Sequence, residues 1–333
     1  MRVFVTGAAG FLGTATAKAA AAAGHEVLAM HRPSSQLGYS GVEPVAGDLR
    51  QPGPWRDRLA DCEAVIHCAA AASGDLATQL AGTVLATENL LAALPAGLKR
   101  FVHVSSFSVY DFGEPKWFGS LHESTATEHN PARRDAYTQT KLLQEEMVRS
   151  HCQQRGIPLV VVRPGAIYGP GKDWDFGRAM KLGKLDLIFA PSSRMRLVHV
   201  DDCAKALVAA LDAPVEGELI VNVVGEDQPS HWSFHRRARR AGAAVGTPVP
   251  VPYPLVRALG GVAWLASRLF FRGKARLPEM LDLPRQQVRW RNLRYPASKA
   301  KARLGWSETV PLSQGIGGIV KTNNQSGKFY FPT

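Results

Sequence analysis

Tyr137 and Lys141 are the two residues whose types and spacing most directly suggest chemistry. The segment 135–155 has the pattern of a long helix, in which side chains four residues apart share one face. An ammonium group beside a phenol favours the phenolate. We therefore expect Lys141 to lower the pKa of Tyr137 from about 10 toward neutral pH, as acid–base catalysis requires. The alternative is a surface tyrosine and lysine that are four apart by chance.

Ser105 and Ser106 stand at the end of a strand that we predict over residues 100–105. A hydroxyl group at this place can bond a substrate carbonyl oxygen. The helix with Tyr137 and Lys141 follows this strand, so the serine, the phenol and the ammonium group can meet at one edge of a sheet. The residues alone leave Ser105 and Ser106 both open as the source of this hydroxyl, beside Tyr137 and Lys141 as the predicted acid–base pair.

Gly7, Gly10 and Gly13 follow an apolar run over residues 2–5 and precede an alanine-rich helix predicted over 14–23. Glycines with this spacing permit a tight turn, a close approach of the backbone to a pyrophosphate and close packing of the helix on the sheet. The helix N-terminus then directs free N–H groups at the anion. Glycines also mark ordinary turns, but the strand before and the helix after favour a nucleotide site.

His31 and Arg32 directly follow the second predicted strand, over residues 26–30, and no carboxylate stands at this place. An acidic side chain at this place normally accepts the adenosine ribose 2′-OH of NAD, whereas an arginine accommodates the 2′-phosphate of NADP. Arg32, with the hydroxyl of Ser34, therefore favours NADP, with NAD as the second choice. The alternative is that Arg32 is a solvated loop residue.

Strands and helices alternate through the first two-thirds of the chain. Further strands are predicted over 42–46, 64–67 and 159–163, and a further helix over 83–94. This alternation predicts an α/β fold of the Rossmann type, a doubly wound parallel sheet with its ligands at the carboxyl ends of the strands. We expect residues 1–165 to bind the nucleotide, with 195–225 returning to this domain. Residues 166–194 and 226–333 form a smaller, discontinuous C-terminal substrate domain.

Several segments together resemble the extended short-chain dehydrogenase/reductase family, which includes NAD(P)-dependent epimerases and dehydratases. The chain looks closest to the branch of the dihydroflavonol reductases and 3β-hydroxysteroid dehydrogenases. The segments that carry this resemblance are Thr6–Gly13, Gly47-Asp48-Leu49, His67-Cys68-Ala69-Ala70, Val104–Tyr110, Tyr137-x-x-x-Lys141, Arg163–Gly171, Val198–Asp202 and Leu304-Gly305-Trp306.

The resemblance implies a mechanism in which Tyr137 exchanges a proton with the substrate oxygen, Ser106 positions that oxygen and Lys141 bonds the nicotinamide ribose. The cofactor contacts that follow from the motifs are Thr6, Gly7, Gly10, Phe11, Leu12, Gly13, His31, Arg32, Ser34, Asp48, Leu49, Cys68, Ala69, Ala70, Thr87, Tyr137, Lys141, Pro164, Gly165 and Ile167. Candidate substrate residues are Ser108, Tyr110, Trp174 and Trp264. Two positions depart from the family: Thr83 replaces a frequent asparagine, and Asp111 replaces the usual glycine.

The chain of 333 residues carries a net charge of +12, and this charge is unevenly distributed. From Glu226 onward it has 18 Lys/Arg and 5 Asp/Glu, or +13, which leaves 12 − 13 = −1 for residues 1–225. A basic C-terminal third suits an anionic partner, or it is a solvated face. Without a recognisable nucleic-acid module, we expect no nucleic acid as a partner.

Four cysteines without metal-ligand spacing predict reduced thiols and no metal site. Without a signal-peptide pattern, we expect a cytoplasmic protein, and we further expect a homodimer.

Residues 254–271 form the most apolar segment, interrupted by Arg257 and Arg268 and followed by Arg272, Lys274 and Arg276. It is too interrupted for a spanning helix. We favour a lid or core helix over peripheral membrane contact through 254–276. Either interpretation supports a small-molecule substrate of apolar character.

The sequence therefore predicts an NADP(H)-dependent oxidoreductase that transfers hydride between the nicotinamide and an apolar carbonyl or alcohol. The alternative is a nucleotide-sugar epimerase or dehydratase with tightly bound NAD, whose substrate diphosphate would explain the basic C-terminal third. A non-catalytic NADP-sensing protein would have little use for the set of Ser106, Tyr137 and Lys141.

Overall fold

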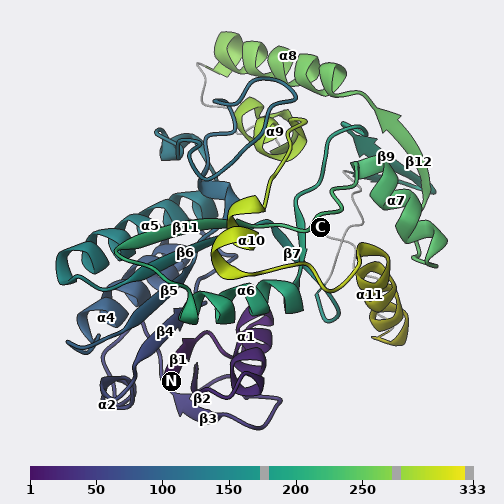
Figure 1. Cartoon of the computed structure of the whole chain (residues 1–333). Coiled ribbons are helices and arrows are strands. Elements are labelled where there is room, and N and C mark those ends of the chain that lie inside the picture. The colour runs from purple at the N-terminus through teal and green to yellow at the C-terminus, as the bar shows by residue number, and fades with distance from the viewer. Residues whose placement is uncertain (173–179, 272–278, 327–333) are drawn as a thin grey trace.

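A seven-stranded parallel sheet forms the centre of the computed structural model, which describes residues 1–172, 180–271 and 279–326 (Figure 1). The strand order is β11-β6-β5-β4-β1-β2-β3. The strands are β1 (Arg2–Thr6), β2 (Glu26–His31), β3 (Glu43–Ala46), β4 (Ala64–His67), β5 (Arg100–Val104), β6 (Leu159–Pro164) and β11 (Glu218–Val223). The parallel sheet and its flanking helices confirm the predicted Rossmann-type fold.

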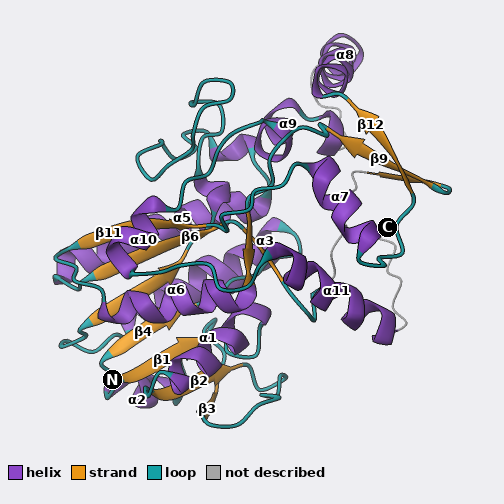
Figure 2. Ribbon diagram, turned by 45° about the vertical axis from the view of Figure 1, so that its right-hand side comes forward, coloured by secondary structure: helices purple, strands orange, loops and turns teal. Residues whose placement is uncertain are grey.

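Helices cover both faces of this sheet (Figure 2). One layer is α1 (Phe11–Ala22) and α6 (Val200–Asp212), and the other is α2 (Trp55–Ala60), α4 (Ala86–Ala92) and α5 (Ala136–Arg155). Val3 and Val5 pack into the first layer and Phe4 into the second, because successive strand residues point to opposite faces. Each such apolar side chain contributes roughly 1.5–3 kcal/mol when it is buried.

The long helix α5 begins and ends where its caps require. The Asp135 side chain accepts a hydrogen bond from the Thr138 N–H at 2.9 Å, which satisfies a free donor of the first turn. Gly156 ends the helix in the left-handed conformation, with φ of 63°. Tyr137 therefore lies in the first turn and Lys141 one turn further along. A short π-helix, η1 (Leu80–Leu85), precedes α4 and contacts α5.

The remaining elements form a smaller layer beyond the carboxyl ends of the strands (Figure 1). β7 (Ala166–Tyr168) pairs in parallel with β10 (Leu197–His199), and β8 (Met180–Leu182), β9 (Leu185–Phe189) and β12 (Thr247–Val251) form a separate sheet. The helical elements of this part are α7 (His231–Arg240), α8 (Tyr253–Phe271), η4 (Glu279–Leu281), α9 (Leu283–Trp290) and α11 (Leu312–Ser326). Helix α10 (Ser298–Leu304) contacts β11 and α6 instead.

Three observations bear on the expected division into domains and on helix α8. β10 pairs with β7 and not with the large sheet, so only β11 and α6 of the segment 195–225 return to that sheet as expected. Ala300 and Trp306 are buried in the same core as Val3, so α10 packs on the nucleotide-binding part although 226–333 was expected to lie outside it. Helix α8 was expected as a lid or core helix, and the core alternative is wrong, because most of its large apolar side chains are exposed.

Candidate active site

The loop between β1 and α1 has the shape that a dinucleotide pyrophosphate needs. Gly7 adopts φ of +68°, and a Cβ atom at Gly13 would lie 2.0 Å from the Gly7 carbonyl oxygen. Neither position accepts another residue without moving the backbone. Gly10 starts α1 without a side-chain cap, so the N–H groups of the first helical turn are open to an anion. The residues present therefore fit a nicotinamide dinucleotide.

Lys172 lies beside this loop, although the sequence analysis did not single it out. Its ammonium group is 5.4 Å from the centre of the Phe11 ring and donates to the Ile167 carbonyl oxygen at 3.2 Å. Burial lowers the pKa of Lys172. The sequence feature that could have indicated this residue is the segment Gly169-Pro170-Gly171-Lys172, a glycine-rich turn that ends in a cation.

Arg32 is exposed at the end of β2, where the sequence analysis expects the adenosine ribose. The His31 ring Nδ1 lies 3.0 Å from the carbonyl oxygens of both Arg32 and Ser35, which orders the loop that carries Arg32 and Ser34. Hydrogen bonds from Arg50 lower the pKa of the Asp48 carboxyl, and the charge of Arg32 lowers it further. Arg32 and Arg50 thus both stand close to Asp48.

Ser106 leaves β5 in extended conformation and starts the short 3-10 helix η2 (Phe107–Val109). Its Oγ accepts a hydrogen bond from the Ser108 N–H at 3.1 Å. This bond fixes the oxygen, and the hydroxyl hydrogen stays available as a donor. Ser106 also hydrogen-bonds the Tyr137 phenol, a contact that lowers the pKa of Tyr137. The structure therefore brings together Ser106 and Tyr137, as the sequence predicts.

The predicted depression of the Tyr137 pKa is not found. Burial is the largest influence and raises the pKa of Tyr137 above its usual value, and the nearby Asp135 carboxylate raises it as well. The Lys141 ammonium is not among the groups that shift the Tyr137 pKa, and its hydrogen bonds go to Val104 and Gln144. The four-residue spacing correctly predicts that the phenol and the ammonium group share one face of the helix. It does not predict which groups the ammonium contacts.

Lys141 is buried and donates to the Val104 carbonyl oxygen and to Gln144 Oε1, each at 2.6 Å. Burial lowers the pKa of Lys141 to about 8, while the carboxylate of Glu145 raises it in part. An ammonium group has three donors. Two of them have acceptors within the described residues, so Lys141 is held at the end of β5 with one N–H remaining for a ligand.

Gln144 connects Lys141 to a fully buried polar network that sequence reasoning missed. Its Nε2 donates to Thr87 Oγ1 at 2.8 Å and lies 3.1 Å from His67 Nε2. On its other side, His67 Nδ1 is 2.8 Å from Thr6 Oγ1. Burial, followed by the charge of Lys141, lowers the pKa of His67 to about 3, so this ring is neutral. The network holds the ends of β1 and β4 against Lys141.

Thr83 and Thr87 belong to this arrangement through η1 and α4. The Ala71 N–H donates to Thr83 Oγ1 at 2.9 Å, and Thr87 Oγ1 donates to the Thr83 carbonyl oxygen at 2.6 Å. Thr83, which departs from the family's frequent asparagine, thus fixes the loop after β4. Thr87 is completely buried behind that loop.

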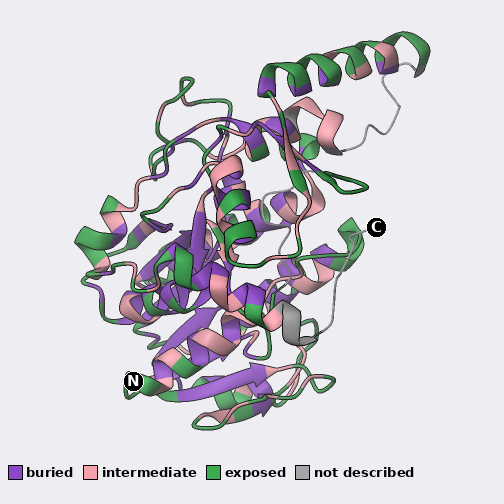
Figure 3. Cartoon of the chain, turned by 90° about the vertical axis from the view of Figure 1, so that its right-hand side faces the viewer, coloured by how far each residue is buried: buried purple, intermediate pink, exposed green. Residues whose placement is uncertain are grey.

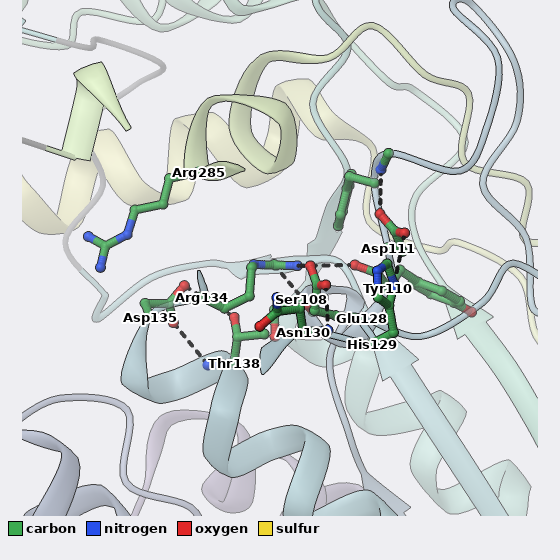
Figure 4. Close-up of polar contacts among 12 residues, drawn as sticks. Ser108, Tyr110, Asp111, Glu128, His129, Asn130, Arg134, Asp135, Thr138 and Arg285 are labelled. Atoms are coloured by element: carbon green, nitrogen blue, oxygen red, sulfur yellow. Dashed lines mark hydrogen bonds and ion pairs between the residues drawn. The ribbon is translucent and has the colours of Figure 1, made fainter. Parts of the chain in front are cut away.

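Arg134 ties the loop after Ser106 to the start of α5 (Figure 4). Its guanidinium group donates to the carbonyl oxygens of Ser108 at 2.9 Å and Tyr110 at 3.3 Å, and to Glu128 Oε2 at 3.0 Å. Arg134 is buried and stands three residues before Tyr137. The same side chain therefore controls the spacing between the serine loop and the phenol.

Asp111 shapes the next part of this loop (Figure 4). Its Oδ1 accepts from the Gly113 N–H at 2.7 Å, and its Oδ2 lies 3.6 Å from His129 Nδ1. The carboxylate that replaces the family's usual glycine thus organises the loop itself.

A second buried polar network lies next to the predicted catalytic residues. Glu145 accepts from Ser105 Oγ and forms a buried ion pair with Arg163, whose Nε lies 3.1 Å from Glu145 Oε2. The Arg163 guanidinium lies 4.6 Å from the centre of the Tyr110 ring. Tyr110 Oη donates to Asn222 Oδ1 at 2.7 Å. These contacts join β5, α5, β6 and β11 near the predicted catalytic residues.

The candidate substrate residues differ in burial and in hydrogen bonding. Tyr110 is completely buried and its phenol is engaged with Asn222, which argues against direct contact with a substrate. Ser108 Oγ is buried and has no hydrogen-bond partner among the residues that the structure describes. Trp264 is 48% exposed on α8, with the Arg268 guanidinium 5.5 Å from its ring. Trp174 lies outside the described residues.

The other predicted cofactor residues line the same strand ends. Leu49 is buried and its carbonyl oxygen accepts from Asn89, while Gly165 passes so close to Arg196 that a Cβ atom would lie 2.5 Å from the Arg196 carbonyl oxygen. The remaining positions lie in or directly after elements at this edge of the sheet, namely α1, β4, β6 and β7: they are Leu12, Cys68, Ala69, Ala70, Pro164 and Ile167. The four cysteines are free, and the described residues contain no cluster suited to a metal ion.

This geometry agrees with the comparisons to known proteins. A model of the NAD dependent epimerase/dehydratase family matches residues 3–224. The chain belongs to the NAD dependent epimerase/dehydratase family. It is an enzyme of the extended short-chain dehydrogenase/reductase type, as the sequence motifs predict.

Relatives in this family include both oxidoreductases and epimerases. The chain is 27% identical to a 2-alkyl-3-oxoalkanoate reductase of Stenotrophomonas maltophilia, over 95% of this chain and 97% of the relative. It is 26% identical to 3beta-hydroxysteroid-dehydrogenase/decarboxylase isoform 1 of Arabidopsis thaliana, over 87% of this chain and 70% of the relative. The structure of UDP-glucuronic acid 4-epimerase from Bacillus cereus in complex with NAD is similar with a TM-score of 0.72. At 22% identity over 98% of this chain and 100% of that one, this likeness concerns the fold.

Proposed function

We propose that the protein is an NADP(H)-dependent oxidoreductase that transfers hydride between the nicotinamide and an apolar carbonyl or alcohol. The observation that carries this proposal is the contact of Ser106 with Tyr137 just after β5, the strand whose last residue, Val104, also holds the Lys141 ammonium group. Hydroxyl, phenol and ammonium groups together can bind and protonate a carbonyl oxygen.

In the proposed reaction, the substrate oxygen lies between the Ser106 hydroxyl and the Tyr137 phenol. The bound nicotinamide supplies or accepts a hydride at the substrate carbon. Ser106 donates a hydrogen bond that orients the oxygen, and Tyr137 gives it a proton in the direction of reduction. The role that the family resemblance implies for Lys141 is to stabilise the resulting phenolate electrostatically and to offer its third N–H to the nicotinamide ribose.

The preference for NADP rests on Arg32. It follows β2 at the place where NAD-dependent relatives of this fold have a carboxylate, and a guanidinium group suits a 2′-phosphate. An oxidoreductase is further supported by the names of two relatives that match most of the chain, a reductase and a dehydrogenase/decarboxylase. Those names also favour a substrate with an apolar carbonyl or alcohol.

A nucleotide-sugar epimerase or dehydratase is the second candidate. The observation that favours it is the basic C-terminal third, with +13 from Glu226 onward, which suits a substrate diphosphate. Such an enzyme returns the hydride to its own substrate and retains NAD. The homodimer and the cytoplasmic location stay predictions. None of the described helices is both long and apolar enough to cross a membrane.

Two measurements on the purified protein separate these candidates. We expect it to be isolated without tightly bound dinucleotide and to oxidise NADPH, followed at 340 nm, with ketones or aldehydes of increasing apolar length. Isolation with stoichiometric NAD, together with conversion of a sugar nucleotide and no net NADPH oxidation, would establish the epimerase instead. A wild-type preference for NADH would overturn the choice of cofactor.

A further inference from the structure

Helix α8 turns an apolar face away from the protein. Its exposed large side chains recur every three or four residues up to Leu269, with Phe270 next to it, and their exposed fractions run from 50% to 78%. They are Leu255, Leu259, Val262, Leu265, Leu269 and Phe270. Figure 3 shows α8 at the outer edge of the molecule, and Figure 1 places it far from the seven-stranded sheet. Scattered exposed leucines are ordinary, but a continuous stripe of this kind marks an interaction surface.

The opposite face of α8 attaches the helix to the rest of the chain. Val256, Gly260 and Ser267 are buried, and Gln286 of α9 donates to the Val256 carbonyl oxygen at 3.2 Å. A Cβ atom at Gly260 would lie 2.9 Å from the Leu281 carbonyl oxygen, so the helix is seated closely on η4 and α9. The outward stripe is thus a fixed feature of the folded chain.

The charges on α8 are all positive. The helix contains no aspartate or glutamate, and the two exposed cations Arg257 and Arg268 fall on one flank of the stripe. Trp264 lies on that same flank, with the Arg268 guanidinium 5.5 Å from its ring. Arginine and tryptophan at the border of an apolar helix face are typical of helices that lie in a membrane interface. In the sequence, Arg272, Lys274 and Arg276 follow directly.

Two more aromatic side chains are exposed beside the first turn of α8. Trp117 is 52% exposed and its ring centre lies 5.7 Å from that of Tyr253, the first residue of the helix. Phe118 is 69% exposed and adopts φ of 61°, which is unusual for a bulky residue. This loop adds aromatic rings of the kind that favour the interface between lipid headgroups and acyl chains.

We propose that α8, with the loop of Trp117 and Phe118, binds the surface of an anionic phospholipid bilayer and lies parallel to it. An anionic surface complements the positive flank of α8 and the charge of +13 from Glu226 onward. A second copy of the chain is a poorer partner, because each copy carries +12 and α8 brings arginines without acidic residues to match them. This surface is independent of the reaction at Tyr137.

Flotation of the full chain with vesicles tests the proposal. The probes are phosphatidylcholine vesicles with and without phosphatidylglycerol, at low and high salt. We expect binding to the anionic vesicles that salt weakens. The double variant Leu265→Glu, Leu269→Glu should bind at least tenfold more weakly, because each leucine loses its transfer into the interface. The double variant Arg257→Gln, Arg268→Gln should lose about fivefold per arginine.

A matched control carries the same two changes elsewhere. Leu182 and Leu185 are exposed by 60% and 39% in β8 and β9, so Leu182→Glu, Leu185→Glu alters charge equally without touching α8. Failure of the wild type to float with anionic vesicles at low salt would overturn the proposal, as would equal losses in both leucine pairs. So would self-association in sedimentation velocity that the α8 pair abolishes, without vesicle binding. If thermal unfolding shows that the α8 pair is misfolded, the exposed arginine pair decides.

Discussion

Gln144 offers the sharpest test of how Lys141 is held. The change Gln144→Leu removes one of the two hydrogen-bond acceptors of the ammonium group, both at 2.6 Å, and keeps a side chain of similar length. A hydrogen bond to a charged group is worth about 1.5–3 kcal/mol, and 1.36 kcal/mol corresponds to about one pKa unit. The pKa of Lys141, which burial already lowers to about 8, should therefore fall to about 6–7 in this variant.

The direction in which Gln144→Leu changes the activity depends on whether the charged form of Lys141 is the active one. If the ammonium stabilises the phenolate, kcat/KM is highest with Lys141 protonated and falls as the pH rises through the pKa of Lys141, about 8 in the wild type. At pH 7.5 roughly three-quarters of the wild-type lysine is charged, but only about 3–25% in the variant. We expect the variant to lose about three- to 25-fold at pH 7.5 and to approach the wild type near pH 5.5.

The assay is the pH profile of kcat/KM for NADPH-dependent reduction, with Gln144→Glu as the matched control. A carboxylate beside the ammonium favours its charged form, so this variant should move the alkaline limb above that of the wild type. A loss by the same factor at every pH in Gln144→Leu would refute the reasoning, because it would show damage to packing and no effect on the charge of Lys141.

Three further predictions concern the cofactor, the serine loop and the buried ion pair. Arg32→Ala should weaken the binding of NADPH by about 1.5–3 kcal/mol and leave the binding of NADH nearly unchanged, whereas Lys172→Met should weaken the binding of both. Fluorescence titration measures each affinity. Equal losses of affinity for both cofactors in Arg32→Ala would contradict the 2′-phosphate assignment. Arg134→Met should lower kcat about tenfold to 100-fold with NADPH affinity intact, because the serine loop loses its tie to α5; a parallel loss of affinity would show a general loss of structure. Glu145→Ala should lower the free energy of urea unfolding by about 3–5 kcal/mol, because it leaves the Arg163 guanidinium buried and unpaired. The apolar double variant Glu145→Leu, Arg163→Met should recover most of this free energy. An unaltered unfolding midpoint in Glu145→Ala would contradict a stabilising role of the ion pair.

The parts of the site that the sequence predicted are those that local rules determine. The glycine loop follows from backbone conformation at Gly7 and close approach at Gly13, and the pairing of Tyr137 with Ser106 follows from helix phase and strand order. Such requirements are visible in a few consecutive residues.

Residues whose partners come from distant elements were missed. Gln144 reads as an ordinary polar residue of a long helix until β4 brings His67 against it, 77 positions away in the chain. Arg134 reads as a loop cation until the carbonyl oxygens of the serine loop surround it. The same limit applies to α8, which was expected as a lid or core helix, because an apolar composition does not say whether another element covers it.

The central claim is that Tyr137 exchanges a proton with the substrate oxygen, and Tyr137→Phe tests it most directly. This change removes the phenol oxygen and leaves the ring to pack. Single-turnover oxidation of bound NADPH, compared with NADPH binding measured by fluorescence, separates chemistry from affinity. General acid–base catalysis contributes about 10²–10⁴-fold, so hydride transfer should slow by that factor with binding unchanged. Hydride transfer at a near-normal rate in Tyr137→Phe would contradict the account.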